Sequence, residues 1–342
     1  RAYPRTMSVR SLPVLDLSLL DQGPDAAEAF RAELRRATHE VGFFYLVGTG
    51  VSPELEGRLH RAARTFFELP DEAKLEIENI KSPHFRGYTR IGGERTQGLV
   101  DWREQIDIGP ERPAVAGPDA PDYAVLVGPN LWPSAQPELR AIAEEWTTIL
   151  SRVARTLLRA WAEALGAPAT YFEDHFGEAQ TLLKIVRYPG STAPEPQQGV
   201  GAHKDSGVLT LLWVEPGKGG LQVERDGGWV DAPAIPGTFV VNIGELLEHA
   251  TGGYLTATNH RVVSPRAPED RISVPFFFNP SLDAELPPIE LPAELAAHAR
   301  GVAQDPRNPI HGLHGENALK SRLRAHPDVA EIWHPDLVAA RS

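Results

Sequence analysis

The chain contains no cysteine and a single methionine. The lack of thiols excludes disulfides, thiolate metal ligands and a cysteine nucleophile, and it fits a reducing, cytoplasmic location. No apolar run approaches the length needed to cross a bilayer and no signal peptide is visible, so we expect no membrane partner. Positive charge is also scarce, with 34 Lys and Arg against 46 Asp and Glu. The resulting net charge of −12 argues against nucleic acid as a partner, because phosphate binding requires a basic face.

Length and the position of the methionine predict the domain organisation. We interpret Met7 as the natural start and residues 1–6 as foreign to the protein. A chain of 342 residues with 42% hydrophobic residues can bury one large core, and β-cored enzymes of this size commonly fold as one unit. We therefore predict a single domain, with a mixed helical part over residues 7–180, a β-rich core over 181–280 and a helical part over 281–342. No feature of the sequence indicates an oligomeric state.

Helices are predicted where apolar residues recur every three or four positions. One helix begins at Pro24, and another follows the capping residue Ser52. A long helix is predicted over residues 137–165, after a proline-rich linker. Two further helices are predicted over 293–304 and 316–325, and two His-Pro-Asp sequences near the C-terminus are read as turns or helix starts. Between residues 181 and 280 the apolar runs are short and separated by Gly and Pro, which is typical of strands and turns.

The most informative short motif is His203-Lys204-Asp205, beside a predicted strand. Residues i and i+2 of a strand point to the same side, so this spacing predicts an imidazole and a carboxylate on one face of a sheet. His260, at the start of a later predicted strand, is the candidate third ligand; His249 is a weaker competitor. Two histidines and one carboxylate form the facial triad that binds non-haem Fe(II) and leaves coordination positions open.

An Arg-x-Ser motif follows the candidate third ligand. Arg271 and Ser273 share one face of a predicted strand, and this is the only Arg-x-Ser in the chain. A guanidinium group beside a hydroxyl is a good receptor for a carboxylate.

With these motifs in this order, the chain resembles the Fe(II)- and 2-oxoglutarate-dependent dioxygenases of the isopenicillin N synthase type, which include plant flavonoid and gibberellin oxygenases. The similarity covers most of the chain and extends to segments before, between and after the motifs. These segments are Leu12–Leu17, Gly42–Leu46, Leu183–Pro189, Gly219–Val223, Gly228–Val230, Asn242–Leu247 and Gly253–Tyr254.

The resemblance implies an α+β fold with a double-stranded β-helix core (a jelly-roll, as in cupins) flanked by helices. It further implies that His203, Asp205 and His260 bind Fe(II) and carry catalysis. Arg271, Ser273 and Tyr188 would bind the distal carboxylate of 2-oxoglutarate, although the asparagine that the family usually has two residues before this tyrosine is Val186 here. Dioxygen would be consumed, 2-oxoglutarate would yield succinate and CO2, and ascorbate could serve as a reductant in vitro.

The expected reaction is hydroxylation, desaturation or ring closure of a small molecule such as a secondary metabolite. An anionic substrate is expected, because cations lie among aromatic residues in the region that the family places over the mouth of the barrel. The candidate substrate residues are Arg86, Tyr88, Arg103, Gln105, Phe276 and Phe278.

Two alternatives stay open at this point. The first is an oxidase of the isopenicillin N synthase kind, which uses the same triad without 2-oxoglutarate. The second is a non-catalytic, cupin-like binding protein.

Overall fold

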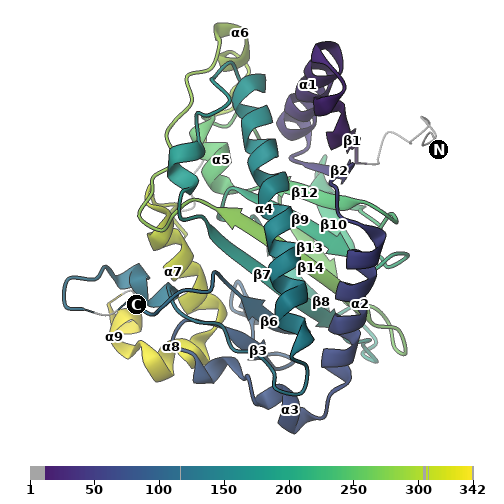
Figure 1. The fold of residues 1–342 in the computed structure, drawn as a ribbon, viewed down its shortest axis with the longest axis vertical. Coiled ribbons are helices and arrows are strands. Elements are labelled where there is room, and N and C mark those ends of the chain that lie inside the picture. Colours follow the sequence, from purple (N-terminus) through teal and green to yellow (C-terminus); the bar gives the residue numbers. More distant parts are fainter. Residues whose placement is uncertain (1–11, 116, 303–305, 307, 341–342) are drawn as a thin grey trace.

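The structure is a computed structural model, which describes residues 12–115, 117–302, 306 and 308–340. The predicted start at Met7 and the predicted helix end at Gln304 lie outside these residues. Two β-sheets and a layer of helices make up the core (Figure 1).

The larger sheet has eight strands in the order β1-β2-β12-β9-β14-β7-β6-β3. Only β1 and β2 pair in parallel; the other neighbours in this sheet are antiparallel. Its strands are β1 (Val14–Asp16), β2 (Phe43–Val47), β3 (Gly87–Thr89), β6 (Glu104–Ile108), β7 (Gln180–Tyr188), β9 (Leu209–Val214), β12 (Phe239–Ile243) and β14 (Arg271–Asn279).

A four-stranded sheet with the order β11-β10-β13-β8 faces the larger one. Its strands are β8 (Gln198–His203), β10 (Leu221–Arg225), β11 (Gly228–Asp231) and β13 (His260–Val263), and a separate hairpin pairs β4 (Arg95–Thr96) with β5 (Leu99–Val100). Val186 and Tyr188 of the large sheet share a buried cluster with Val200, Val223 and Val262 of the small one. This apolar layer between the sheets is the interior of the predicted jelly-roll.

Helices α1 (Pro24–Glu40), α2 (Pro53–Glu68) and α4 (Glu138–Ala164) cover the opposite face of the large sheet (Figure 1). The other described helices are α3 (Asp71–Leu75), α5 (Glu245–Ala250), α6 (Ala293–Ala296), α7 (His314–Ala325), α8 (Pro327–Trp333) and α9 (Pro335–Ala339). The long helix α4 lies across the strands and buries Trp146 and Trp161 completely. Full burial of a large apolar side chain contributes about 1.5–3 kcal/mol, so these two tryptophans hold α4 firmly against the sheet. Within the described ranges, each helix is too short or too polar to span a bilayer.

Most predicted helices are confirmed. The hydroxyl of Ser52 accepts the N–H of Leu55 and caps α2, and both His-Pro-Asp sequences begin short helices. The predicted helix over 293–304 is wrong in length, because α6 ends at Ala296. After it, the N–H groups of Arg300 and Gly301 bond to the carbonyls of residues 253 and 252 instead of continuing a helix.

Candidate metal centre and its surroundings

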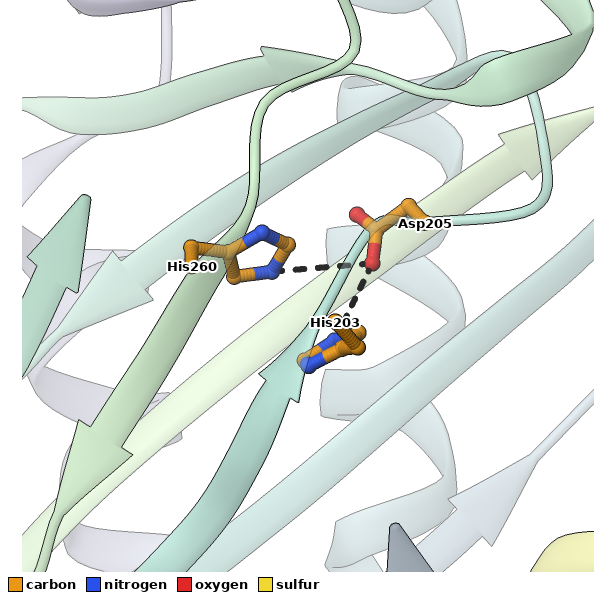
Figure 2. Close-up of side chains that lie close together, drawn as sticks. All are labelled: His203, Asp205 and His260. Carbon is orange, nitrogen blue, oxygen red and sulfur yellow. Dashed lines mark ion pairs between the residues drawn. The ribbon is translucent and has the colours of Figure 1, made fainter. Parts of the chain in front are cut away.

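Three side chains converge between the two sheets. His203 ends β8, His260 begins β13, and Asp205 follows His203 by two residues (Figure 2). The Nε2 atoms of His203 and His260 lie 3.4 and 3.6 Å from Oδ1 of Asp205. One ligand atom from each residue lies within 4.8 Å of those of the other two, which is close enough for one ion to bind all three. His203 and His260 are also directly paired across the β8–β13 ladder.

Hydrogen bonds to the backbone orient both imidazoles. Nδ1 of His203 lies 2.8 Å from the carbonyl oxygen of Gly201, and Nδ1 of His260 lies 3.2 Å from that of Thr258. A carbonyl can only accept, so each Nδ1 must carry the proton. In the neutral form of each ring, Nε2 then directs a lone pair at the common centre, which is the tautomer that a metal requires.

Asp205 reaches the site from a turn, and the prediction that it shares a strand face with His203 is wrong. Strand β8 ends at His203, and the backbone carbonyl of Asp205 accepts the N–H of Glu245 at the start of α5. Its Oδ2 accepts hydrogen bonds from Thr210 Oγ1 at 2.6 Å and Asn242 Nδ2 at 2.7 Å. These two donors are cross-strand partners on β9 and β12. They hold one carboxylate oxygen and leave Oδ1 directed at the two histidines.

The charge states favour cation binding. Burial would raise the pKa of Asp205, but the two histidines and the hydroxyl of Thr210 lower it well below its usual range. Burial, together with the neighbouring His203, lowers the pKa of His260 to about 4, so this imidazole is neutral at pH 7. Burial would lower the pKa of His203 as well, but Asp205 raises it overall. A metal would displace the Nε2 proton that Asp205 favours on His203, which leaves a donor set of one carboxylate and two neutral imidazoles that fits Fe(II).

A buried guanidinium group lies on the same side of the large sheet. Arg271 begins β14 directly opposite Tyr188 of β7, and its guanidinium carbon is 4.9 Å from the centre of the tyrosine ring. Arg271 is only 2% exposed, yet its Nε and Nη1 have no hydrogen-bond partner in the described part of the chain. Burial lowers its pKa. Ser273, two residues along the same strand, is buried on the same face. An unpaired buried cation is costly, so this arrangement suits an anionic ligand.

Three candidate substrate residues point away from the metal centre, contrary to expectation. Tyr88 packs on Phe66 of α2 and donates to Glu104, and Phe276 and Phe278 belong to the cluster beneath the helices. For the two phenylalanines, the alternation of side chains along β14 explains this placement. Along β14, Arg271 and Ser273 share one face, so Phe276 and Phe278 must occupy the other.

The same alternation places Phe277 on the metal side, where it is the cross-strand partner of Thr210. The alternation along β14 could have distinguished Phe277 from Phe276 and Phe278 in the sequence. Of these three phenylalanines, Phe277 is the best candidate for a substrate contact. Sequence reasoning also missed Thr210 and Asn242 as partners of Asp205, because finding them requires the pairing of β9 with β12.

Arg103 lies close enough to the metal centre to act on the charge of His203. Arg103 Nη2 is 3.0 Å from Glu94 Oε2 and 3.3 Å from Asp101 Oδ2, while its Nε has no partner among the described residues. Burial would lower the pKa of Arg103, but nearby groups that include Glu94 and the Tyr188 hydroxyl raise it overall. The Arg103 charge in turn acts on His203, whose pKa it lowers in opposition to Asp205.

In the large sheet, Gln105 is the cross-strand partner of Val186, which is in turn the partner of Ser273. Its Nε2 donates to Asp107, and its buried Oε1 has no partner in the described ranges. Arg86 lies at the start of β3, where Nη1 and Nη2 donate to the carbonyls of His84 and Leu126.

Comparisons with known proteins agree with this geometry. Residues 179–280 match the family described as the 2OG-Fe(II) oxygenase superfamily, and residues 12–135 match that of the non-haem dioxygenase in morphine synthesis N-terminal region. The chain is 39% identical to the 2-oxoglutarate-dependent dioxygenase frbJ of Dothideomycetidae sp., over 97% of this chain and 95% of frbJ. It is 34% identical to a homoarginine-6-hydroxylase of Arabidopsis thaliana, over 89% of this chain and 95% of the hydroxylase.

A solved structure of similar fold is that of a full-length Neurospora crassa protein in complex with alpha-KG and thymine. The TM-score is 0.72 at 25% identity, covering 96% of this chain and 98% of that one.

Proposed function

Because the chain belongs to the 2OG-Fe(II) oxygenase superfamily, we propose that His203, Asp205 and His260 hold the iron of a 2-oxoglutarate-dependent oxygenase. The observation that carries this proposal is the convergence of three donor atoms whose remaining polar atoms are bonded within the protein. Such outer bonds fix the ligands before the metal arrives.

The activity itself follows from the relatives. The expectation of a 2-oxoglutarate-dependent oxygenase that acts on a small molecule is confirmed, and the relatives do not favour an oxidase that dispenses with 2-oxoglutarate. An intact triad within an oxygenase family also leaves the binding-protein alternative without support. The predicted cytoplasmic location and the single-domain boundaries stay predictions.

Arg271, Ser273 and Tyr188 are proposed to receive the distal carboxylate of 2-oxoglutarate. The support is the pair of buried nitrogen donors on Arg271 that lack a partner within the described ranges and need an anion, together with the adjacent hydroxyl groups. A guanidinium group can hold a carboxylate through two parallel hydrogen bonds, which fixes orientation as well as position. The ring of Tyr188 beneath the guanidinium restricts its movement.

When bound, Fe(II) and 2-oxoglutarate supply the oxidising chemistry, which hydroxylates, desaturates or cyclises the substrate and yields succinate and CO2. The chain's own residues contribute placement. Thr210 and Asn242 keep Oδ1 of Asp205 turned toward the histidines. Arg271 would hold the far end of the cosubstrate at a fixed position on β14, and the apolar layer between the sheets keeps bulk water away from this end of the site.

For the substrate, we propose a small molecule with an anionic group that contacts Arg103 and Gln105. Within the described part of the chain, Nε of Arg103 and Oε1 of Gln105 have no hydrogen-bond partner, which supports a polar ligand beside these two residues. A relative named for homoarginine acts on an amino acid, which carries a carboxylate. Arg86 also has a buried Nε without a partner among the described residues, but it is a weaker candidate because both its Nη atoms already donate to carbonyls.

The test of the proposed function is dioxygen uptake by the Fe(II)-loaded protein. Uptake should require 2-oxoglutarate, yield succinate in equal amount and disappear in His203→Ala. A panel of amino acids that includes homoarginine would be screened for compounds that accelerate uptake. For any compound found, we expect Arg103→Gln to raise KM and Arg86→Gln to leave it nearly unchanged. An unchanged KM in Arg103→Gln would contradict the anionic contact, and uptake without 2-oxoglutarate would contradict the function.

A further inference from the structure

A segment from the N-terminal half of the chain lies on the strand that ends at His203. This segment, residues 94–103, contains the β4–β5 hairpin. The side-chain amide of Gln97 donates to the carbonyl of Ala202 at 3.0 Å, and the backbone N–H of Trp102 donates to the carbonyl of Gln198 at 2.8 Å. The segment is therefore bonded to both ends of β8.

Asp101 is the buried centre of this contact. It is 0% exposed, and its Oδ1 accepts the backbone N–H of Gly201 at 3.2 Å and the side-chain amide of Gln198 at 2.9 Å. Its Oδ2 accepts the hydroxyl of Thr96 at 2.7 Å and lies 3.3 Å from Arg103 Nη2. Burying a carboxylate is costly unless both oxygens are compensated, and here both are.

Gly201 connects this carboxylate to the metal ligand. Its N–H donates to Asp101, and its carbonyl accepts from Nδ1 of His203. The sheet itself holds this residue weakly. Strand β8 is an edge strand, and its register with β13 shifts between the pairs His260–His203 and Val262–Val200, so that β8 bulges around Gly201. A bulge leaves the backbone without regular ladder bonds, so its orientation must be fixed by other groups.

We propose that Asp101 is a positioning residue for the metal centre: it fixes the Gly201 peptide, whose carbonyl in turn fixes the tautomer and direction of the His203 ring. This inference rests on the proposed role of His203 as a metal ligand. Asp101 belongs to the region 12–135, which matches a different family description from the one that covers the ligands. The inference thus assigns the N-terminal half a defined part in building the iron site.

The test is the affinity for Co(II), measured by titrating the metal-free protein and following the visible d–d absorption, without turnover. Asp101→Asn retains an oxygen for Gly201 and loses the charge. Asp101→Glu retains the charge but moves the oxygens, and Asp101→Ala removes both. Thr96→Val is the matched control, because it removes a bond to Oδ2 and leaves those to Oδ1. Wild type and His203→Ala give the Kd for Co(II) with all three proposed ligands present and with one ligand removed.

We expect the Kd for Co(II) to rise about tenfold in Asp101→Ala and Asp101→Glu, as is typical when an outer partner of a ligand is lost. Asp101→Asn and Thr96→Val should stay within about threefold of wild type on the same scale. Equal constants for the Asn and Glu variants would overturn the inference, as would an unchanged Asp101→Ala. If Asp101→Ala does not fold, the comparison of Asn with Glu decides in the same way. Failure of wild type to bind Co(II) in a His203-dependent manner would instead overturn the metal assignment, and this inference with it.

Discussion

Replacing Arg271 with Met should separate the stability of the empty protein from its response to 2-oxoglutarate. Arg271 is a fully buried cation, two of whose donor nitrogens have no partner among the residues that the structure describes. Leaving such a group unsatisfied costs about 1–3 kcal/mol. Methionine has similar length and no charge, so the variant without ligand should be more stable than wild type by an amount in that range. A 342-residue chain has an unfolding entropy of about 0.7 kcal/mol/K, so this gain corresponds to a Tm increase of about 1–4 °C.

Stabilisation by 2-oxoglutarate, in contrast, should be smaller in Arg271→Met than in wild type. A bidentate carboxylate contact is worth about 3 kcal/mol, so its loss should raise the Kd for 2-oxoglutarate about 100-fold. At a concentration 100 times the wild-type Kd, 2-oxoglutarate stabilises wild type by about 2.7 kcal/mol, or about 4 °C. At that concentration the variant should gain only about 0.4 kcal/mol, or less than 1 °C.

The assay is thermal unfolding of the Mn(II)-loaded protein with and without 2-oxoglutarate. Arg140→Met is the control, since Arg140 loses the same charge at a half-exposed surface position paired with Glu144. If Arg271→Met keeps the full Tm shift with 2-oxoglutarate, Arg271 does not bind the cosubstrate. If the variant without ligand melts several degrees below wild type, Arg271 stabilises the empty protein, contrary to our expectation.

Three further predictions concern other parts of the site. Asn242→Leu, which removes one of two donors to Oδ2 of Asp205, should raise the Kd for Co(II) about tenfold by titration; an unchanged Kd would remove Asn242 from the site. Phe276→Ala should cost about 3–5 kcal/mol in urea unfolding, whereas Phe277→Ala, on the metal side, should cost less and lower substrate kcat/KM; equal stability losses would contradict the facing of β14. Burial alone would raise the pKa of Glu94, but neighbouring cations lower it to about 2 from an ordinary 4.5. Its contribution to stability is therefore present above pH 4.5 and lost as the pH falls toward 2. Glu94→Gln should therefore weaken the loss of unfolding free energy between pH 4.5 and 2, and an unchanged pH dependence would contradict the lowered pKa of Glu94.

The parts of the site that the sequence predicted correctly are those that depend on local alternation. Arg271 and Ser273 lie on one face because β14 continues through both without interruption. His260 begins a strand as expected. The convergence of His203 and Asp205 was anticipated for a reason that the structure does not support, since Asp205 lies in a turn whose shape depends on α5 and on two other strands.

The residues that the sequence could not place depend on pairing between distant segments. Tyr88 sits on a three-residue strand, whose facing is set by its register with β6 and by the packing of α2. Asp101 reaches Gly201 across about a hundred residues. No periodicity within residues 81–110 indicates that part of this segment joins the large sheet and part lies on β8, because short strands carry too few positions to show alternation.

We expect the triad and Arg271 together to bind a chelated 2-oxoacid. The measurement to make is an anaerobic titration of the Fe(II)-loaded protein with 2-oxoglutarate, following the weak visible charge-transfer band of the chelate. We expect a band in wild type, no band in His203→Ala, and a band in Arg271→Met only at far higher 2-oxoglutarate concentration. A wild-type protein that demonstrably binds iron yet develops no band would contradict this expectation.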